Sequence, residues 1–318
     1  MKEYGPVPGD ACARFAGRPT FLCLPHTTRP QGADVAVLGV PFDAAAGGRT
    51  GARFGPGAIR QASMNIRPYY SPSQRIAPFD HVSVIDRGDA PVDPGFMDRT
   101  FDYVQAAAGE LLASDVVPLC LGGDHVVTLA ALRAVAHRHG PVALVLFDAH
   151  ICCNDEIDGE RYGHGTLVRR AADEGIIDPK RSFLLGSRGG TLGPEEAQGA
   201  RELGLTVVAW DDLAQLGTGM ISAAVEAAVG PAYLSYDVDF LDPAFAPGVS
   251  EPEVGGPTSM QALALLRACR GLQVVGADVT SVAPEHDGAG ITAALAATLA
   301  FEIITLLACE RQARKEDP

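Results

Sequence analysis

The sequence of residues 142–150 is VALVLFDAH, in which six consecutive apolar residues are followed by Asp148, Ala149 and His150. An apolar side chain at every successive position is expected for a strand that is covered on both faces of a sheet, whereas a half-exposed strand would alternate. Runs of this kind recur along the chain, and we predict strands at residues 34–40, 82–85, 116–121, 142–147, 182–185, 205–210, 232–236 and 272–279.

Stretches of helical character separate these apolar runs. The clearest are residues 101–113, 126–137, 222–229 and 260–270. An alternation of strands and helices predicts a largely parallel sheet with helices on both faces, which is a three-layer α/β/α architecture. No low-complexity linker interrupts the chain, and its Gly and Pro residues are spread throughout. We therefore expect a single domain over residues 1–318.

The composition excludes several classes of protein. The 318 residues are 47% hydrophobic and 20% charged, which is typical of a globular chain and not of a disordered or fibrous one. A formal net charge of −14 argues against the broad basic surface of a nucleic-acid-binding protein. The seven cysteines are scattered without zinc-finger spacing, and the N-terminus lacks the apolar core of a signal peptide. We expect a cytoplasmic protein with reduced thiols.

One apolar run is nearly long enough to cross a membrane. Residues 291–309 approach the ~20 residues that a spanning helix needs. The run is rich in Ala, contains Glu302 and leads into a charged tail at residues 310–317. These features favour a buried C-terminal helix over a membrane span.

Polar clusters follow three of the predicted strands. The first contains His125, the second Asp148 and His150, and the third Asp237 and Asp239. In parallel sheets ligands bind beyond the carboxyl ends of the strands, and residues two apart on an extended chain face the same side. A single pair of this kind could be a helix cap. Three clusters, however, would bury several carboxylates together, and this costs much free energy unless a cation neutralises their charge. The set therefore predicts a divalent metal site, and mixed Asp/His ligation suits Mn, Ni, Zn or Fe better than Ca or Mg.

These clusters resemble the signatures of the ureohydrolase family, which includes arginases, agmatinases and proclavaminate amidinohydrolases. The resemblance rests on GGDH at residues 122–125, on the DAH that starts a D-A-H-x-D pattern at residue 148, and on SYDVDFLDPAFAPG at residues 235–248. GARFGPGAIR at residues 51–60 is similar to the agmatinase and proclavaminate amidinohydrolase branch. The resemblance covers nearly the whole chain and implies an arginase-like fold with a mostly parallel, eight-stranded sheet.

The resemblance also implies a site with two manganese ions that activates water to attack a guanidinium carbon, releasing urea and an amine. By position, His125 would bind the first metal, Asp148 and Asp237 would bridge both, and His150 and Asp239 would bind the second. Two cations lower the pKa of shared water and hold it beside its target, so the implied chemistry is physically consistent. The implied partners are a small cationic or guanidino-type substrate and further copies of the chain, as a trimer or hexamer.

Two further residues are implied by their place in the family's motif order. His164, in YGHGT at residues 162–166, falls where the family keeps a proton-shuttling histidine, and with Asp148 it is our predicted catalytic residue. Asn154 falls where arginases place a residue that contacts the polar end of the substrate.

The chain departs from the family's pattern at two positions. Cys152 stands where the D-A-H-x-D pattern has an aspartate that binds the first metal, and a soft thiol favours Zn, Ni or Fe over Mn. Ser281 stands where a glutamate of the family holds the substrate's guanidinium, and a serine offers no countercharge. Glu285, or the two acids at residues 248–253, could substitute for it.

Three functions remain open at this point. The first is a dinuclear ureohydrolase with an altered first site. The second is a hydrolase with one metal, held by Asp148, His150 and Asp239 in an arrangement similar to that of the deacetylases that share this fold. The third is a silent relative that acts as a binding protein or subunit, and a Cys152 or Cys153 nucleophile is a minor fourth. We predict a metal-dependent hydrolase of the amidinohydrolase type, acting on a linear C–N bond with a non-standard substrate or metal.

Overall fold

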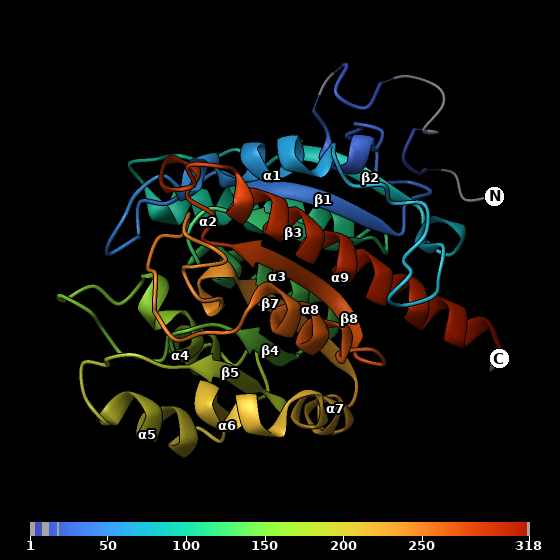
Figure 1. Cartoon of the computed structure of the whole chain (residues 1–318). Coiled ribbons are helices and arrows are strands. Elements are labelled where there is room, and N and C mark those ends of the chain that lie inside the picture. The colour runs from blue at the N-terminus through green and yellow to red at the C-terminus, as the bar shows by residue number, and fades with distance from the viewer. Residues whose placement is uncertain (1–3, 8–12, 18, 317–318) are drawn as a thin grey trace.

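The computed structural model describes residues 4–7, 13–17 and 19–316. Part of the N-terminus, on which the expectation of no signal peptide rests, lies outside the described residues. A central sheet carries helices on both faces (Figure 1). Its strand order is β2-β1-β3-β8-β7-β4-β5-β6, and every neighbouring pair is parallel. The predicted three-layer fold is confirmed. The strands are β1 (Val35–Val40), β2 (Val84–Asp89), β3 (Val117–Gly122), β4 (Ala143–Phe147), β5 (Phe183–Ser187), β6 (Thr206–Ala209), β7 (Pro231–Asp237) and β8 (Gln273–Thr280).

The sheet is covered on both sides because alternate side chains of its strands enter two separate apolar cores. In β1, Val35 and Val37 belong to the core on the side of α1, α6, α7, α8 and α9, whereas Ala36 and Leu38 belong to the core on the side of α2, α3, α4 and α5. Both sets are buried, which explains the continuous apolar runs in the sequence. The helices are α1 (Gly55–Ser63), α2 (Met97–Leu112), α3 (Val127–His139), α4 (Leu167–Asp173), α5 (Glu195–Glu202), α6 (Trp210–Leu216), α7 (Thr218–Ala227), α8 (Ser259–Arg267) and α9 (Ile291–Glu316).

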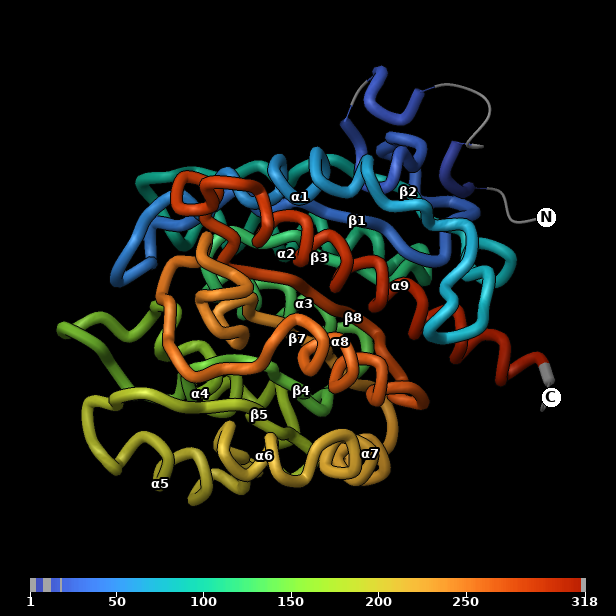
Figure 2. The backbone as a smooth tube through the Cα atoms, viewed as in Figure 1, coloured from blue at the N-terminus to red at the C-terminus, as the bar shows by residue number. Residues whose placement is uncertain are grey.

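The apolar C-terminal run forms α9, which lies along α1 and α8 (Figure 2). By length and composition alone α9 could cross a membrane, but 78% of its most apolar window is buried inside the protein. Its glutamate, Glu302, is buried between Arg267, whose guanidinium lies 2.6 Å from Oε1, and the amide of Gln74, which donates to Oε2 at 2.8 Å. Such pairing is how a core helix accommodates a buried carboxylate.

The four strands at the centre of the sheet position the polar clusters. β3, β8, β7 and β4 are consecutive neighbours, so their carboxyl ends meet at one edge. The turn after β3 needs glycine, because a Cβ atom at Gly123 would lie 1.7 Å from the carbonyl oxygen of Phe42. This close approach lets the chain bend at once after β3 and present His125 beyond the strand ends, just before α3.

Candidate metal centre

The five side chains predicted as metal ligands converge above the central strands. His125 Nδ1 lies 2.8 Å from Asp148 Oδ2 and 3.1 Å from Asp237 Oδ2. His150 Nδ1 lies 3.0 Å from Asp239 Oδ2 and 3.4 Å from Asp148 Oδ1. The two oxygens of Asp148 therefore face different histidines, and Asp148 stands between two groups of ligand atoms.

These atoms form two overlapping clusters, each compact enough to hold one metal ion. We call His125, Asp148 and Cys152 the first cluster, and Asp148, His150 and Asp239 the second cluster. Within each, one ligand atom per residue lies within 4.8 Å of the others. The first cluster is buried throughout, whereas His150 gives the second cluster a partly exposed face.

The orientation of His125 fits a metal ligand. Its Nε2 lies 2.9 Å from the hydroxyl of Ser235, which itself donates to Asp278 Oδ1 at 2.7 Å. The Ser235 oxygen therefore accepts from Nε2–H, which leaves the lone pair of the neutral ring on Nδ1. His125 Nδ1 is buried and forms no hydrogen bond of acceptable geometry within the described chain. A divalent cation in the first cluster would use this nitrogen.

Electrostatics at the two clusters favour a cation. Burial raises the pKa of Asp239, and repulsion from Asp237 and Asp148 raises it further. Burial would lower the pKa of His125, but the negative charges of Asp237 and Asp148 next to its Nδ1 hold it well above its usual value. Among the described residues, only the two histidines form ion pairs with these carboxylates. The field that raises the proton affinity of the histidines would attract a divalent ion equally.

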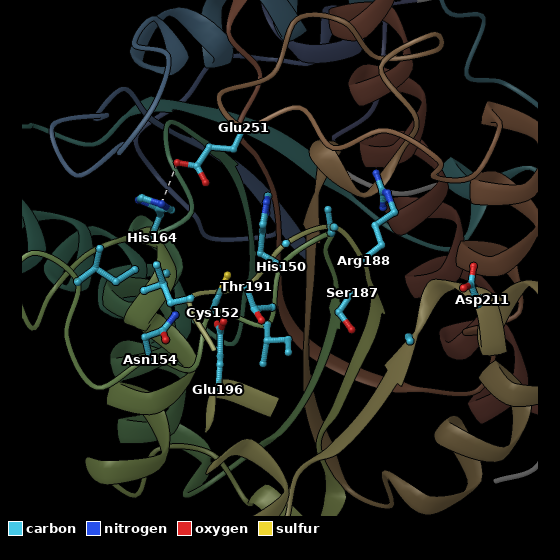
Figure 3. Close-up of a pocket in the computed structure, with 18 residues that line it drawn as sticks. His150, Cys152, Asn154, His164, Ser187, Arg188, Thr191, Glu196, Asp211 and Glu251 are labelled. Carbon is cyan, nitrogen blue, oxygen red and sulfur yellow. Dashed lines mark ion pairs between the residues drawn. The ribbon is translucent and has the colours of Figure 1, made fainter. Parts of the chain in front are cut away.

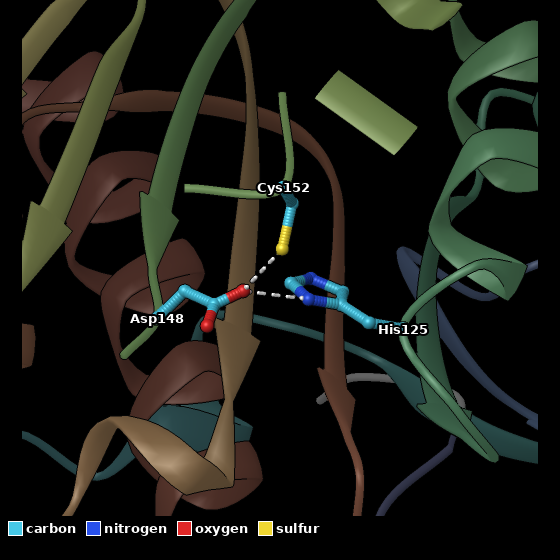
Figure 4. A group of neighbouring side chains, drawn as sticks. All are labelled: His125, Asp148 and Cys152. Carbon is cyan, nitrogen blue, oxygen red and sulfur yellow. Dashed lines mark hydrogen bonds and ion pairs between the residues drawn. The ribbon is translucent and has the colours of Figure 1, made fainter. Parts of the chain in front are cut away.

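Cys152 points toward the other two residues of the first cluster, Asp148 and His125, as Figure 4 shows. Its Sγ lies 3.2 Å from Asp148 Oδ2, and the residue is 2% exposed with a positive φ of 55°. Burial, and then the charge of Asp148, raises the pKa of this thiol well above its usual value. Burial likewise raises the pKa of Cys153 to about 12. Neither thiol is activated as a nucleophile, because nucleophilic cysteines depend on a lowered pKa.

Ser281, at the end of β8, is directed at a metal ligand. Its hydroxyl donates to Asp237 Oδ2, the residue is 4% exposed, and its φ is 68°. Glu285 lies elsewhere: it is exposed on the 3-10 helix Pro284–His286, and its carboxylate is 3.5 Å from where a Cβ atom of Gly51 would lie. Glu285 lines neither of the two cavities that border the clusters.

His164 opens a short 3-10 helix (His164–Thr166) before α4 and lies over the entrance to the clusters. Its Nδ1 lies 2.7 Å from the carbonyl oxygen of Ala45, and its Nε2 lies 2.9 Å from Glu251 Oε1 (Figure 3). Both ring nitrogens thus face acceptors, which suits the doubly protonated imidazolium. Burial would lower the pKa of His164, but the hydrogen bond and charge of Glu251 raise it to about 9.

An open cavity of about 610 Å³ leads to the two clusters. Asn154 lines it, together with Glu196 and Asp211, and a small inner cavity continues from it to the ligand atoms. The two cavities share His150, Cys152, His164 and Glu251.

Sequence reasoning did not identify Arg188, which stands at the cavity wall after β5. Its guanidinium donates to the carbonyl oxygens of Asp239, Phe240 and Glu253, and so ties the loop after β7 to β5. The sequence signal that could have identified Arg188 is its place in the polar stretch that follows the apolar run 182–185. The acids at residues 248–253 were noticed in the sequence, but the pairing of Glu251 with His164 was not.

Comparisons with known proteins agree with this geometry. A model of the arginase family matches residues 33–305. Guanidinopropionase from Pseudomonas aeruginosa is 44% identical over 97% of this chain and 98% of its own. Mitochondrial agmatinase from Gallus gallus is 41% identical over 93% of this chain and 88% of its own. A solved structure of proclavaminate amidinohydrolase from Streptomyces clavuligerus matches with a TM-score of 0.89 and 41% identity, covering 93% of this chain and 99% of that one.

Proposed function

The chain belongs to the arginase family, and on this premise we propose that it is a metal-dependent hydrolase that cleaves a linear C–N bond of a guanidino or amidino small molecule. The resemblance to the agmatinase and proclavaminate amidinohydrolase branch is confirmed. The observation that carries the proposal is the pair of ligand clusters that share Asp148. Two cations side by side at the end of a cavity can activate water next to a bound substrate.

The donor set supports two divalent metal ions. Asp148, His150 and Asp239 offer the oxygen and nitrogen ligands of a manganese site. In the first cluster Cys152 adds a sulfur, and we propose that this position accepts Zn, Ni or Fe more readily than Mn. When bound, the metal pair supplies a Lewis acid that lowers the pKa of a water molecule.

The side chains around the clusters have separate roles in this proposal. Hydrolysis forms a bond from the water oxygen to the guanidinium carbon and breaks the C–N bond to the rest of the substrate, so that urea and an amine leave. Asp148 faces the ring of each histidine and so belongs to both ligand clusters. His164, whose pKa of about 9 keeps it protonated at neutral pH, gives its Nε2 proton to the leaving nitrogen. Asn154, on the wall of the outer cavity, contacts the far end of the substrate.

A second candidate is a hydrolase that uses the second cluster alone. The observation that favours it is the buried thiol of Cys152, which takes the place of an oxygen or nitrogen ligand in the first cluster. A first cluster with a thiol in place of a carboxylate would then bind its metal weakly, and Asp148, His150 and Asp239 would hold one ion. Its substrate would be an amide or amidine.

Location and assembly belong to the proposal as well. We place the protein in the cytoplasm as a homo-oligomer, trimeric or hexameric, by its resemblance to the family. Size-exclusion chromatography with light scattering would measure the assembly directly.

Metal analysis together with a urea-release assay tests the proposed function. We expect two equivalents of metal per chain after expression in metal-replete medium, and urea from at least one of 3-guanidinopropionate, 4-guanidinobutyrate, agmatine, arginine and free guanidine. One equivalent of metal with no urea, but with amide hydrolysis, would favour the second candidate. A fully metallated protein that releases urea from none of these compounds and hydrolyses no amide would contradict both.

A further inference from the structure

A substrate with a guanidinium or amidinium group needs a negative partner near the metal clusters. Asp148 and Asp239 of the clusters, and Asp237 beside them, are each paired with a histidine. Ser281 is neutral, and its hydroxyl already donates to Asp237. A charge-assisted hydrogen bond is roughly twice as strong as a neutral one, so the loss of a carboxylate at residue 281 would weaken the binding of a cation considerably.

Glu251 supplies a carboxylate to the inner cavity that Ser281 also lines, from a different loop. It follows the segment 235–248 that carries the family signature, and it lines both the outer and the inner cavity. The adjacent acid, Glu253, is turned away, because its carboxylate packs where a Cβ atom of Gly189 would lie, 2.0 Å from Oε2. Of these two acids, only Glu251 borders the inner cavity.

One oxygen of Glu251 is free to meet a ligand. Oε1 accepts from His164 Nε2, whereas Oε2 has no hydrogen bond or ion pair within the described part of the chain. The side chain is 27% exposed, and Figure 3 shows it beside His164 and above His150. A carboxylate with one oxygen anchored and the other exposed to a cavity has the geometry of a cation-binding group.

The loop before α1 fixes the Glu251–His164 pair in position. A Cβ atom at Gly47 would lie 2.8 Å from His164 Cε1 and 3.2 Å from Glu251 Oε1. The backbone N–H of Arg49 donates to the carbonyl oxygen of Ser250 at 3.2 Å, which ties the same loop to the chain next to Glu251. The pair is therefore packed from behind and faces the cavity.

We propose that Glu251 binds the cationic end of the substrate, in place of the acid that this chain lacks at residue 281. The inference rests on the proposed function for the class of substrate. Glu251 is then a binding residue whose position differs from the one that the family resemblance implies, and it places the cation between His164 and the metal clusters. The glutamate and the histidine that protonates the leaving nitrogen thus form one unit.

Affinity measurements on the metallated protein test this role. We expect Glu251→Gln to weaken the binding of agmatine and 3-guanidinopropionate at least tenfold, as KM for a compound that is hydrolysed and by isothermal titration calorimetry for one that is not. Glu253→Gln is the matched control, because it removes the same charge two residues away and should bind as the wild type does. Metal content and melting temperature, measured on each variant, show that the clusters and the fold are intact.

A second variant guards against a merely structural effect of Glu251→Gln. Glu251→Gln combined with Ser281→Glu returns a carboxylate to the neighbouring strand end, and we expect it to recover at least part of the lost affinity. Unchanged affinity in Glu251→Gln would overturn the inference while leaving the proposed hydrolase intact. Wild-type protein that binds these compounds through Glu251 but releases no urea would instead contradict the hydrolase and keep the inference. A wild-type protein that binds neither compound would overturn the inference.

Discussion

The first and second clusters share Asp148 but differ in depth and in chemistry. The first cluster is buried and contains the thiol of Cys152, whereas the second cluster contains only nitrogen and oxygen ligands and is partly exposed at His150. Both border the outer cavity, the first through Cys152 and the second through His150. The second cluster therefore combines harder ligands with an exposed face, and the first combines a softer ligand with full burial. The comparison shows that a thiol can replace a carboxylate in the first cluster while the second cluster keeps its nitrogen and oxygen ligands.

The largest effect is expected where the two clusters meet. Asp148→Asn removes the carboxylate that faces both histidines, so both metal ions should be lost and the rate of urea release should fall by more than about 10³-fold, or ~4 kcal/mol. Mass spectrometry of bound metal and the urea assay measure the two losses separately. Retention of one equivalent of metal in this variant would show that the clusters are independent.

Cys152→Asp should make the two clusters alike. A carboxylate in place of the thiol hardens the first cluster, and we expect its preference for Mn over Zn to rise by roughly 10- to 100-fold. Competitive loading with equimolar Mn and Zn, followed by metal analysis, gives this ratio. Cys153→Asp serves as the control, since Cys153 belongs to neither cluster. An unchanged ratio would mean that Cys152 does not contact the metal.

Gly47→Ala tests whether His164 and Glu251 can be displaced without affecting the binding of metal by the two clusters. The added methyl group would meet His164 and Glu251, and overpacking of this kind costs about 1–3 kcal/mol. We expect urea release to slow about tenfold or more while both metals stay bound. Gly57→Ala is a suitable control, because nothing lies within 4 Å of a Cβ atom there. Loss of metal in Gly47→Ala would instead link the loop to the clusters.

The smallest effect concerns the Glu251–His164 pair in the protein freed of metal. The pKa of His164 is about 9 in the folded chain, above the ~6.5 of an unfolded histidine. The pair therefore stabilises the fold fully below about pH 6.5 and loses this contribution as the pH rises through 9. We expect Glu251→Gln to lower the free energy of unfolding by about 1 kcal/mol at pH 6 and by almost nothing at pH 10. Urea denaturation measures both, and a difference independent of pH would argue against the ion pair.

The fold was largely predictable because strands covered on both faces leave an uninterrupted apolar signal. Residues 142–147 became β4 almost unchanged, since each of its side chains enters one of the two cores. β2 was harder: residues 82–85 were predicted, but the strand extends to Asp89 through polar residues. Arg60 pairs there with Asp86 and Asp89, and a strand end stabilised by ion pairs carries no hydrophobic pattern.

The convergence of the candidate ligand side chains was predictable for a different reason. Asp148 and His150 are two residues apart at a strand end, and that local spacing survives in three dimensions. The partners of His164 were not predictable, because Ala45 and Glu251 come from loops far away in the chain. The packing of these loops depends on close approaches such as that of Gly47 to His164 and Glu251. Such contacts between distant segments cannot be predicted from local sequence patterns.

Asp278 connects the metal centre to the interior of the protein. It accepts hydrogen bonds from Thr128 of α3 and from Tyr233 and Ser235 of β7, and through Ser235 it fixes the ring of His125. Metal binding and folding are consequently linked: an ion that requires this preset ring binds only the native chain, and acts as a ligand that stabilises it. Mutations in the core beneath Asp278, far from any substrate, should accelerate the escape of metal. The working lifetime of such an enzyme would then be decided as much by its interior packing as by its ligands.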